Sequence, residues 1–300
     1  MRTPQIRSIL TGVEIDESER PDPVLVTAHR LATALGADLH VVHAVESGPI
    51  TPPLLPSLSR DLSQAADALD VVIEDALPSG AEPVSRHVAL GRAHRVLAER
   101  AAELDVDLLV VGPHRDRGIG SGLGTTTDRL LRTSKRPCWV ARGDVELPLR
   151  HLAMATDFSV RSHPALDRAL ALAADLGGAD AGVAPPRLDV VYVEWPATLD
   201  HDPDLVEREL LPQLADEIAA AVDRTGLSGA AVPRPRVIGA VDPSRGILAH
   251  IAEESPSVVA LGTHGRGAVA RTLLGSVASV VAREAPCDVL LVPTPESLDD

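Results

Sequence analysis

Hydrophobic positions along this chain fall into two alternating kinds of segment. Short runs rich in valine, leucine and isoleucine, such as 107–112 and 258–262, are typical of buried strands. Longer stretches between them place apolar residues at helical spacing, as Leu210, Leu214 and Ile218 do. Strands that alternate with helices predict crossover units, and therefore a parallel sheet with helices on both faces.

The pattern occurs twice. The run "LLVVGPHR" at 108 recurs as "VVALGTHG" at 258, and "RPCWVAR" at 136 recurs as "APCDVLLVP" at 285. The chain is therefore a tandem duplication, and we predict two doubly wound α/β domains, residues 1–146 and 147–300, each with a five-stranded parallel sheet. The strands are expected at 8–15, 39–45, 84–90, 107–112 and 138–142, and again at 152–156, 188–193, 235–240, 258–262 and 288–293. The proline-rich segment 45–61 predicts a mobile linker.

Composition and charge exclude several classes of function. The net charge is −15 and aromatic residues make up 1% of the chain, so neither a basic face nor stacking platforms for nucleic acid are expected. No apolar run approaches the length of a membrane span, and acids follow the first residues too early for a signal peptide, so we expect a cytoplasmic protein with no membrane partner. Cys138 and Cys287 each follow a proline and begin an apolar run, which indicates buried strand residues.

A glycine-rich segment, "GTHGRGAVARTLLGS", begins at Gly262 directly after a predicted strand. Gly275 and Ser276 then start a predicted helix. A helix N-terminus attracts anions, and glycines let the backbone approach phosphate oxygens closely. His264 and Arg266 add local positive charge. The segment therefore permits a phosphate site, while a flexible loop before a helix capped by Ser276 remains the alternative.

The same residues resemble a known family. "GTHGRGAVARTLLGSVASVVAREAPCDVLLVP" resembles the signature G-x2-G-x9-G-[ST] of the universal stress protein family, and "LAMATDFSVRSHPALDRALALAADLG" from 152 resembles that family's first strand and helix. Through the repeat, the resemblance extends over nearly the whole chain. It implies an adenosine-binding α/β fold and an ATP site, with Mg²⁺, mainly in the second domain.

The resemblance also implies which residues form that site. Asp157 matches the aspartate near the adenosine, with a helix N-cap as the alternative interpretation; the backbone of Val193 matches the adenine contact, with core packing as the alternative. The full set is Ala155, Thr156, Asp157, Val193, Gly262, His264, Gly265, Arg266, Gly275, Ser276 and Val277. We predict no catalytic residue and no metal-binding site among the side chains.

The first copy departs from this pattern. Gly112, Gly124 and Thr125 are retained, but Arg115 replaces the second glycine and eight residues instead of nine separate it from Gly124. Glu14 stands near the position of Asp157. An arginine cannot give the same backbone approach, although its guanidinium could itself hold a phosphate. We therefore expect a degenerate first site.

These observations favour an ATP-binding stress-response protein in which nucleotide occupancy modulates interactions and catalysis is slow or absent. Alternatives are an adenylate-forming or slowly ATP-hydrolysing enzyme, and a scaffold that binds no ligand. The segment "ATDFSVRS" after the first strand of the second copy lacks the S-G-G-x-D-S loop usual in the adenylate-forming class. The resemblance further implies an internal pseudo-dimer of the two halves and a possible homodimer.

Overall fold

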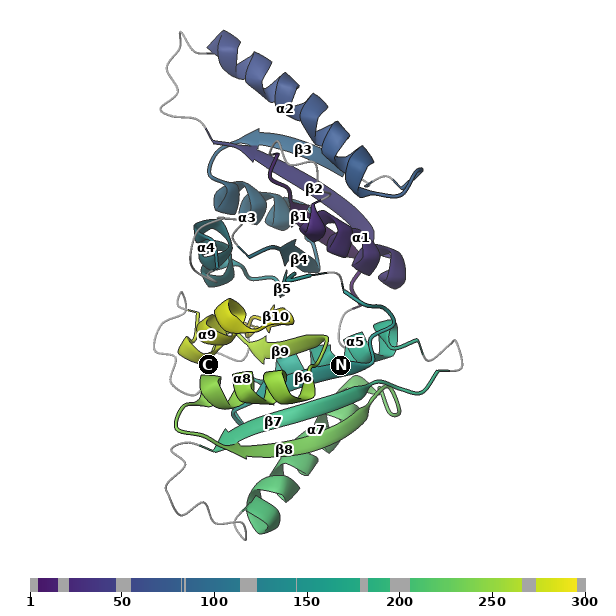
Figure 1. Cartoon of the computed structure of the whole chain (residues 1–300), viewed down its shortest axis with the longest axis vertical. Helices are drawn as coiled ribbons and strands as arrows, with labels where there is room; N and C mark the ends of the chain where they lie inside the picture. Colours follow the sequence, from purple (N-terminus) through teal and green to yellow (C-terminus); the bar gives the residue numbers. More distant parts are fainter. Residues whose placement is uncertain are drawn as a thin grey trace. The chain divides into compact units, whose positions relative to one another are not determined.

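The computed structural model describes residues 5–15, 22–46, 55–81, 83, 85–113, 123–143, 145–178, 183–194, 206–265 and 274–295 of the chain. It contains two compact units that divide between residues 144 and 145 (Figure 1). Both are parallel sheets flanked by helices, so the predicted fold class is confirmed. The division at residues 146 and 147 and the functional contrast between the halves remain predictions.

The first unit has five parallel strands in the order β3-β2-β1-β4-β5. Its elements are β1 (Ser8–Gly12), α1 (Pro23–Leu35), β2 (Asp38–Val45), α2 (Leu55–Ala76), β3 (Ser85–Leu90), α3 (Ala93–Glu103), β4 (Leu108–Val111), α4 (Thr125–Thr133) and β5 (Cys138–Val140). Helices α1 and α2 contact each other, as do α3 and α4. Each predicted strand of this half is present, with its ends shifted by up to three residues.

The second unit repeats the plan in the order β10-β9-β6-β7-β8. Its elements are β6 (His151–Thr156), α5 (His163–Leu176), β7 (Arg187–Glu194), a five-residue π-helix (Val206–Leu210), α7 (Leu211–Thr225), β8 (Val232–Gly239), α8 (Pro243–Glu254), β9 (Val258–Gly262), α9 (Ser276–Glu284) and β10 (Asp288–Val292). Helix α5 contacts α7, and α8 contacts α9. The five predicted strands of this half are also present.

Aliphatic side chains form the core of each unit. In the first unit Ile9, Leu10 and Leu109 are completely buried, and in the second Met154 and Val190 are. Burial of a side chain of this size contributes about 1.5–3 kcal/mol. In the first unit the completely buried Trp139 of β5 adds one aromatic side chain to this core. No helix in the described part of the chain is long and apolar enough to cross a membrane.

The predicted linker over 45–61 is wrong from residue 55 onward, because α2 begins at Leu55. Pro56 falls in the first turn of this helix, where the missing N–H would have no helical partner in any case. Pro56 was therefore compatible with a helix start. Residues 47–54 lie outside the described residues.

A buried ionic cluster lies at the start of the strands in the second unit. Asp189 of β7 is completely buried, and its Oδ2 accepts a 2.8 Å hydrogen bond from Arg187. The same oxygen lies 3.0 Å from Nε2 of His151 and 3.1 Å from Nε2 of His250. Burial alone would raise the pKa of Asp189, but the hydrogen bonds from His151 and Arg187 outweigh it and lower the pKa. Arg187 also donates to Glu254 at 2.5 Å.

Candidate functional site

The order of strands in the second unit defines a crevice at their carboxyl ends. From β6 the chain continues to β7 and β8 on one side, and then to β9 and β10 on the other. Open α/β sheets bind ligands where the strand order reverses in this way. Because β6 and β9 are neighbours, the residues that follow them, Asp157 and Thr263, leave the sheet side by side.

Asp157 and the glycine segment meet at this crevice. A Cβ atom added at Gly265 would lie 2.6 Å from Oδ2 of Asp157, a distance that real Cβ contacts do not reach. A side chain at position 265 would therefore have to displace the carboxylate of Asp157, and the structure brings together two residues that the sequence resemblance assigned to one site. Arg266, the next predicted site residue, lies outside the described residues.

The two ends of the segment are held together. The backbone N–H of Gly275 donates to the carbonyl of Thr263 at 2.8 Å, and a Cβ on Gly275 would lie 3.0 Å from that same oxygen. At the start of the segment, a Cβ on Gly262 would lie 3.2 Å from the carbonyl oxygen of Arg161, before α5. The end of β9 and the start of α9 are consequently adjacent.

Helix α9 presents its N-terminus at this point. Its N-cap is Gly275, whose carbonyl accepts the first helical hydrogen bond from Ser279 at 2.8 Å. Ser276 was expected to be the N-cap; it is instead the first helical residue and is exposed. No side chain among the described residues caps the helix, so its first N–H groups and the positive end of its dipole are available to an anion. Val277 beside it is half-buried.

His264 adds a polar atom to the same place. Its Nδ1 lies 2.9 Å from the hydroxyl of Thr263, while its Nε2 is buried and has no hydrogen-bond partner among the described residues. If the threonine hydroxyl donates to Nδ1, Nε2 carries the proton and becomes a donor. A buried donor without a partner is unfavourable, and a phosphate oxygen would satisfy it.

Hydrogen bonds between its own residues hold the loop after β6. Oδ1 of Asp157 accepts hydrogen bonds from the backbone N–H of Ser159 at 3.0 Å and from its hydroxyl at 2.5 Å. Helix α5 begins only at His163, with Ser162 as its N-cap, so Asp157 does not cap that helix. Ala155 is half-buried in β6 directly before this turn.

Sequence reasoning missed a carboxyl group on α7. Glu217 accepts a 2.8 Å hydrogen bond from the hydroxyl of Thr156, whose oxygen also lies 2.9 Å from that of Ser162. Burial raises the pKa of Glu217; the charge of Asp157 adds to this effect, and the bond from Thr156 opposes it. Glu217 stands in an ordinary amphipathic helix pattern, which gave no signal of this contact.

Val193 lies near the end of β7, with its side chain against α8. Its side chain is 8% exposed and packs on α8, where a Cβ on Gly246 would lie 2.8 Å from Cγ1 of Val193. The pairing of β6 with β7 ends at Thr156 and Tyr192, so Val193 extends one residue beyond it. Both interpretations made from the sequence, core packing and a backbone contact with a base, are therefore compatible with its position.

The corresponding place in the first unit differs. Gly124 and Thr125 begin α4 as Gly275 and Ser276 begin α9, again without a side-chain cap. Glu14 is exposed, and Nδ1 of His43 lies 2.9 Å from the carbonyl oxygen of Val13. Arg115 lies outside the described residues.

The fold is that of a tandem doubly wound α/β protein. The family model described as "Universal stress protein family" matches residues 6–142 and again 148–293. The chain therefore belongs to the universal stress protein family, as two tandem domains.

Individual relatives agree with this assignment. "Universal stress protein A homolog 2" of Coxiella burnetii is 31% identical over 140 residues, which span 43% of this chain and 90% of the relative. The crystal structure of a universal stress protein from Archaeoglobus fulgidus covers 97% of both chains at 19% identity and a TM-score of 0.64, and so shares the tandem fold. The chain also matches a universal stress protein from Archaeoglobus fulgidus in complex with dAMP, at 20% identity and a TM-score of 0.30 over 45% of this chain and 96% of the other.

Proposed function

We propose that the second unit binds an adenine nucleotide, with ATP as its ligand, and that occupancy modulates the interactions of the chain. The phosphates would lie against Gly262, Gly265 and the start of α9 at Gly275 and Ser276. The adenosine would lie by Asp157 and the backbone of Val193. Support comes from family membership and from the arrangement of these residues at one crevice.

The observation that carries this proposal is the combination of Gly265 with His264. Gly265 lets the backbone approach Asp157 where a side chain would collide with the carboxylate, and beside it Nε2 of His264 is buried without a partner among the described residues. An uncapped helix N-terminus completes a set of donors suited to an anion. These features fit a phosphate group better than an empty loop.

The residues also fit a Mg²⁺ ion that accompanies the phosphates. Mg²⁺ prefers oxygen ligands, retains several waters and is usually held by substrate phosphates with one or two protein groups. Here the carboxylate of Asp157, which lies against Gly265, and the hydroxyl of Ser276 at the start of α9 are the oxygen donors that would hold it. The ion, when bound, would neutralise phosphate charge.

We propose little or no catalysis at this site. A hydrolase needs a positioned base or nucleophile beside the phosphates. The hydroxyl of Thr263 is engaged with His264, and Oδ1 of Asp157 is engaged with Ser159. Binding is therefore the chemistry that these side chains support.

Calorimetric titration of the full chain with ATP and Mg²⁺ tests the site. We expect one nucleotide per chain, and we expect Gly275→Val combined with Ser276→Ala to abolish binding, because a larger side chain at 275 would strike the carbonyl of Thr263. The matched control is Gly124→Val with Thr125→Ala at the equivalent helix start of the first unit. If the control abolishes binding and the first pair does not, the assignment to the second unit is wrong.

Two further parts of the proposal concern location and assembly. We propose a cytoplasmic protein whose two halves form an internal pseudo-dimer, with no nucleic-acid or membrane partner. Sedimentation of the chain with and without ATP would give its oligomeric state. A chain that elutes with nucleic acid or floats with vesicles would contradict the choice of partners.

A further inference from the structure

Four basic side chains lie together in the first unit, where α3 begins. Arg92 is the N-cap residue of this helix, and His94 and Arg95 stand in its first turn. Burial is the main cause that lowers the pKa of His94, and the charges of Arg129, Arg95 and Arg92 lower it further. Arg129 belongs to the second turn of α4, so both helices contribute to this place. These four residues are named the basic cluster.

The three arginines of the basic cluster are exposed, and their guanidinium groups have no ion-pair partner within the described part of the chain. Glu46, directly after β2, carries the charge that opposes theirs at His94, and it accepts a 3.4 Å hydrogen bond from the backbone N–H of Ala93. The chain has 43 acidic against 28 basic residues, so the lack of partners does not come from a shortage of acids.

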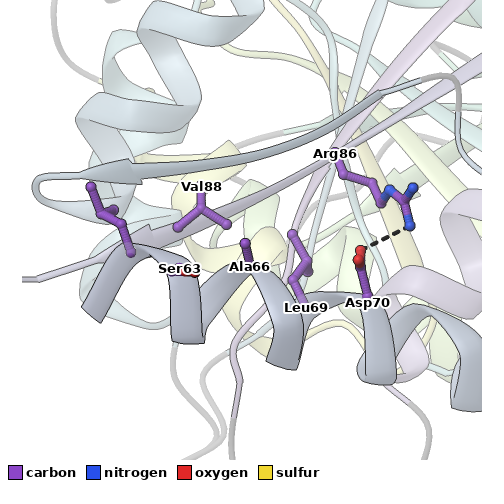
Figure 2. Close-up of a pocket in the computed structure, with 7 residues that line it drawn as sticks. Ser63, Ala66, Leu69, Asp70, Arg86 and Val88 are labelled. Atoms are coloured by element: carbon purple, nitrogen blue, oxygen red, sulfur yellow. Dashed lines mark hydrogen bonds and ion pairs between the residues drawn. The ribbon is translucent and has the colours of Figure 1, made fainter. Parts of the chain in front are cut away.

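Arg86 of the same unit provides a contrast. It lines a groove of about 300 Å³ between α2 and β3, beside Leu69 and Val88, and its Nη1 pairs with Asp70 at 2.8 Å (Figure 2). That groove has an apolar lining and a neutralised charge, which do not suit an anion. The charge of the basic cluster is not neutralised in this way.

The second copy has acids where the first has none. Counted from the first residue of each helix, Asp242 before α8 stands at the place of Arg92, and it caps the helix by accepting a 3.1 Å hydrogen bond from the backbone N–H of Arg245. Arg245 corresponds to Arg95, and its side chain pairs with Glu284 of α9 at 2.6 Å. Its charge is therefore satisfied inside the fold.

The facing helices differ in the same sense. Glu284 is the ninth residue of α9, and the ninth residue of α4 is Thr133; Arg129 corresponds to Val280. The start of α3 also has no side-chain cap, so its N-terminal dipole is not opposed by an acid like Asp242. The first copy thus has both acids replaced and one further arginine at the same places.

The surroundings of the basic cluster indicate which anion it suits. Guanidinium groups bind phosphate through paired N–H donors, and a helix start adds its dipole. Val71 is the exposed large apolar residue of the described first unit, and it stands on α2. Trp139 is the one aromatic residue in the sequence of this half, and it is completely buried. The cluster therefore offers neither the apolar centre of a protein interface nor a platform for a base.

We propose that the basic cluster binds a compact, multiply charged phosphate anion, held by Arg92, Arg95 and Arg129 at the start of α3. The side chains of the first unit supply this site, whereas the glycine segment of the second unit offers mainly backbone. Free inorganic phosphates and the phosphoryl group of a larger molecule share the required chemistry.

The test uses the full chain carrying Gly275→Val and Ser276→Ala, so that the glycine segment takes no part. Calorimetry at low ionic strength measures its affinity for pyrophosphate and, separately, for glycerol 3-phosphate. We expect saturable binding of one anion per chain, and the tighter ligand identifies the source. Mg²⁺–ATP should bind at least about tenfold more weakly than that ligand, because the metal already neutralises part of the phosphate charge.

Variants in this background locate the anion. Arg92→Gln with Arg129→Gln should weaken binding at least about tenfold, because two charge-assisted contacts are lost. Arg60→Gln with Arg234→Gln removes the same charge from two exposed positions elsewhere and should leave the affinity unchanged. Thr133→Glu, at another exposed position, supplies the acid that the second copy has at Glu284 and should weaken binding while every arginine is retained. Thermal melting checks that each variant folds.

His94 reports the bound anion directly. A phosphate beside the arginines opposes their charges, so saturation with pyrophosphate should raise the pKa of His94, measured from its ring protons by NMR and assigned with His94→Gln. Absence of saturable binding, equal losses in the two arginine pairs, an unchanged pKa of His94, or tighter binding of Mg²⁺–ATP than of either probe would each overturn the proposal. None of these results depends on whether the second unit binds a nucleotide.

Discussion

Gly265 lies so close to Asp157 that a Cβ atom on the glycine would be 2.6 Å from the carboxylate oxygen Oδ2. This contact joins the loop after the first strand of the second unit to the loop after its fourth. It fixes one wall of the proposed nucleotide site with no room for a side chain. A larger residue at position 265 would therefore have to move the carboxylate of Asp157.

Gly265→Ala should weaken ATP binding by at least about tenfold, because the added methyl group must displace either Asp157 or the glycine segment. Gly143→Ala is the matched control, since a Cβ there meets no atom within 4 Å. Calorimetric titration of both variants gives the comparison. Wild-type affinity in Gly265→Ala would show that this approach does not shape the site.

Asp189→Ala should destabilise the second unit by about 1–3 kcal/mol, because it removes the acceptor that Arg187, His151 and the buried His250 share. Asp70→Ala removes an exposed ion pair with Arg86 and should change the free energy of unfolding by only about 0–1 kcal/mol. Urea unfolding of the two variants measures the difference. Similar midpoints would mean that Asp189 contributes no more than a surface pair.

His151 should make the second unit less stable in mild acid. Burial is the main cause that lowers its pKa below 6.5; the charge of Arg187 adds to it, while Asp189 and Glu254 oppose it. The unfolded chain therefore takes up this proton first as the pH falls below 6.5, and stability is lost from there down through the folded pKa.

Thermal melting at about pH 7.5 and about pH 5.5 measures this loss. In His151→Gln the decrease between the two values should be smaller than in the wild type, although His29, His40 and His94 of the first unit also have pKa values lowered mainly by burial and will contribute their share. An identical decrease in both proteins would show that His151 is not linked to stability.

Glu217→Gln should stabilise the protein at high pH. The pKa of Glu217 is raised above 4.5, chiefly by burial, so its contribution to stability is present below pH 4.5 and is lost as the pH rises through the folded pKa. A glutamine retains an acceptor for the hydroxyl of Thr156 without a buried charge next to Asp157. We expect a higher melting temperature than wild type near pH 8; a lower one would indicate that the ionised carboxylate is needed.

The architecture was predictable because the spacing of apolar residues within each half and the repetition of that spacing in the other half indicate the same fold. Apolar runs such as 258–262 are bounded by turns, and their recurrence in the second half fixed the plan of both units. The start of α2 was not predictable in the same way, since Pro56 interrupts a helical pattern on paper and is tolerated only because it stands in the first turn. Local sequence patterns therefore locate strands more accurately than they locate the ends of helices.

The site was predictable where a sequence motif places glycines at positions with little room for a side chain. Gly262, Gly265 and Gly275 were singled out, and each is crowded by neighbouring atoms in the structure. The partners of Thr156 and Asp189 could not be found, because Glu217 and His250 come from helices 61 residues farther along the chain. Such contacts depend on tertiary packing, which periodicity does not encode.

The most direct measurement of the central claim is to purify the chain without added nucleotide, denature it, and identify what is released. We predict about one equivalent of adenine nucleotide per chain from the wild type, and none from Gly275→Val with Ser276→Ala. Two equivalents would show that the first unit also binds. Release of none, together with no heat on titration with ATP and Mg²⁺ up to millimolar concentration, would contradict the nucleotide site.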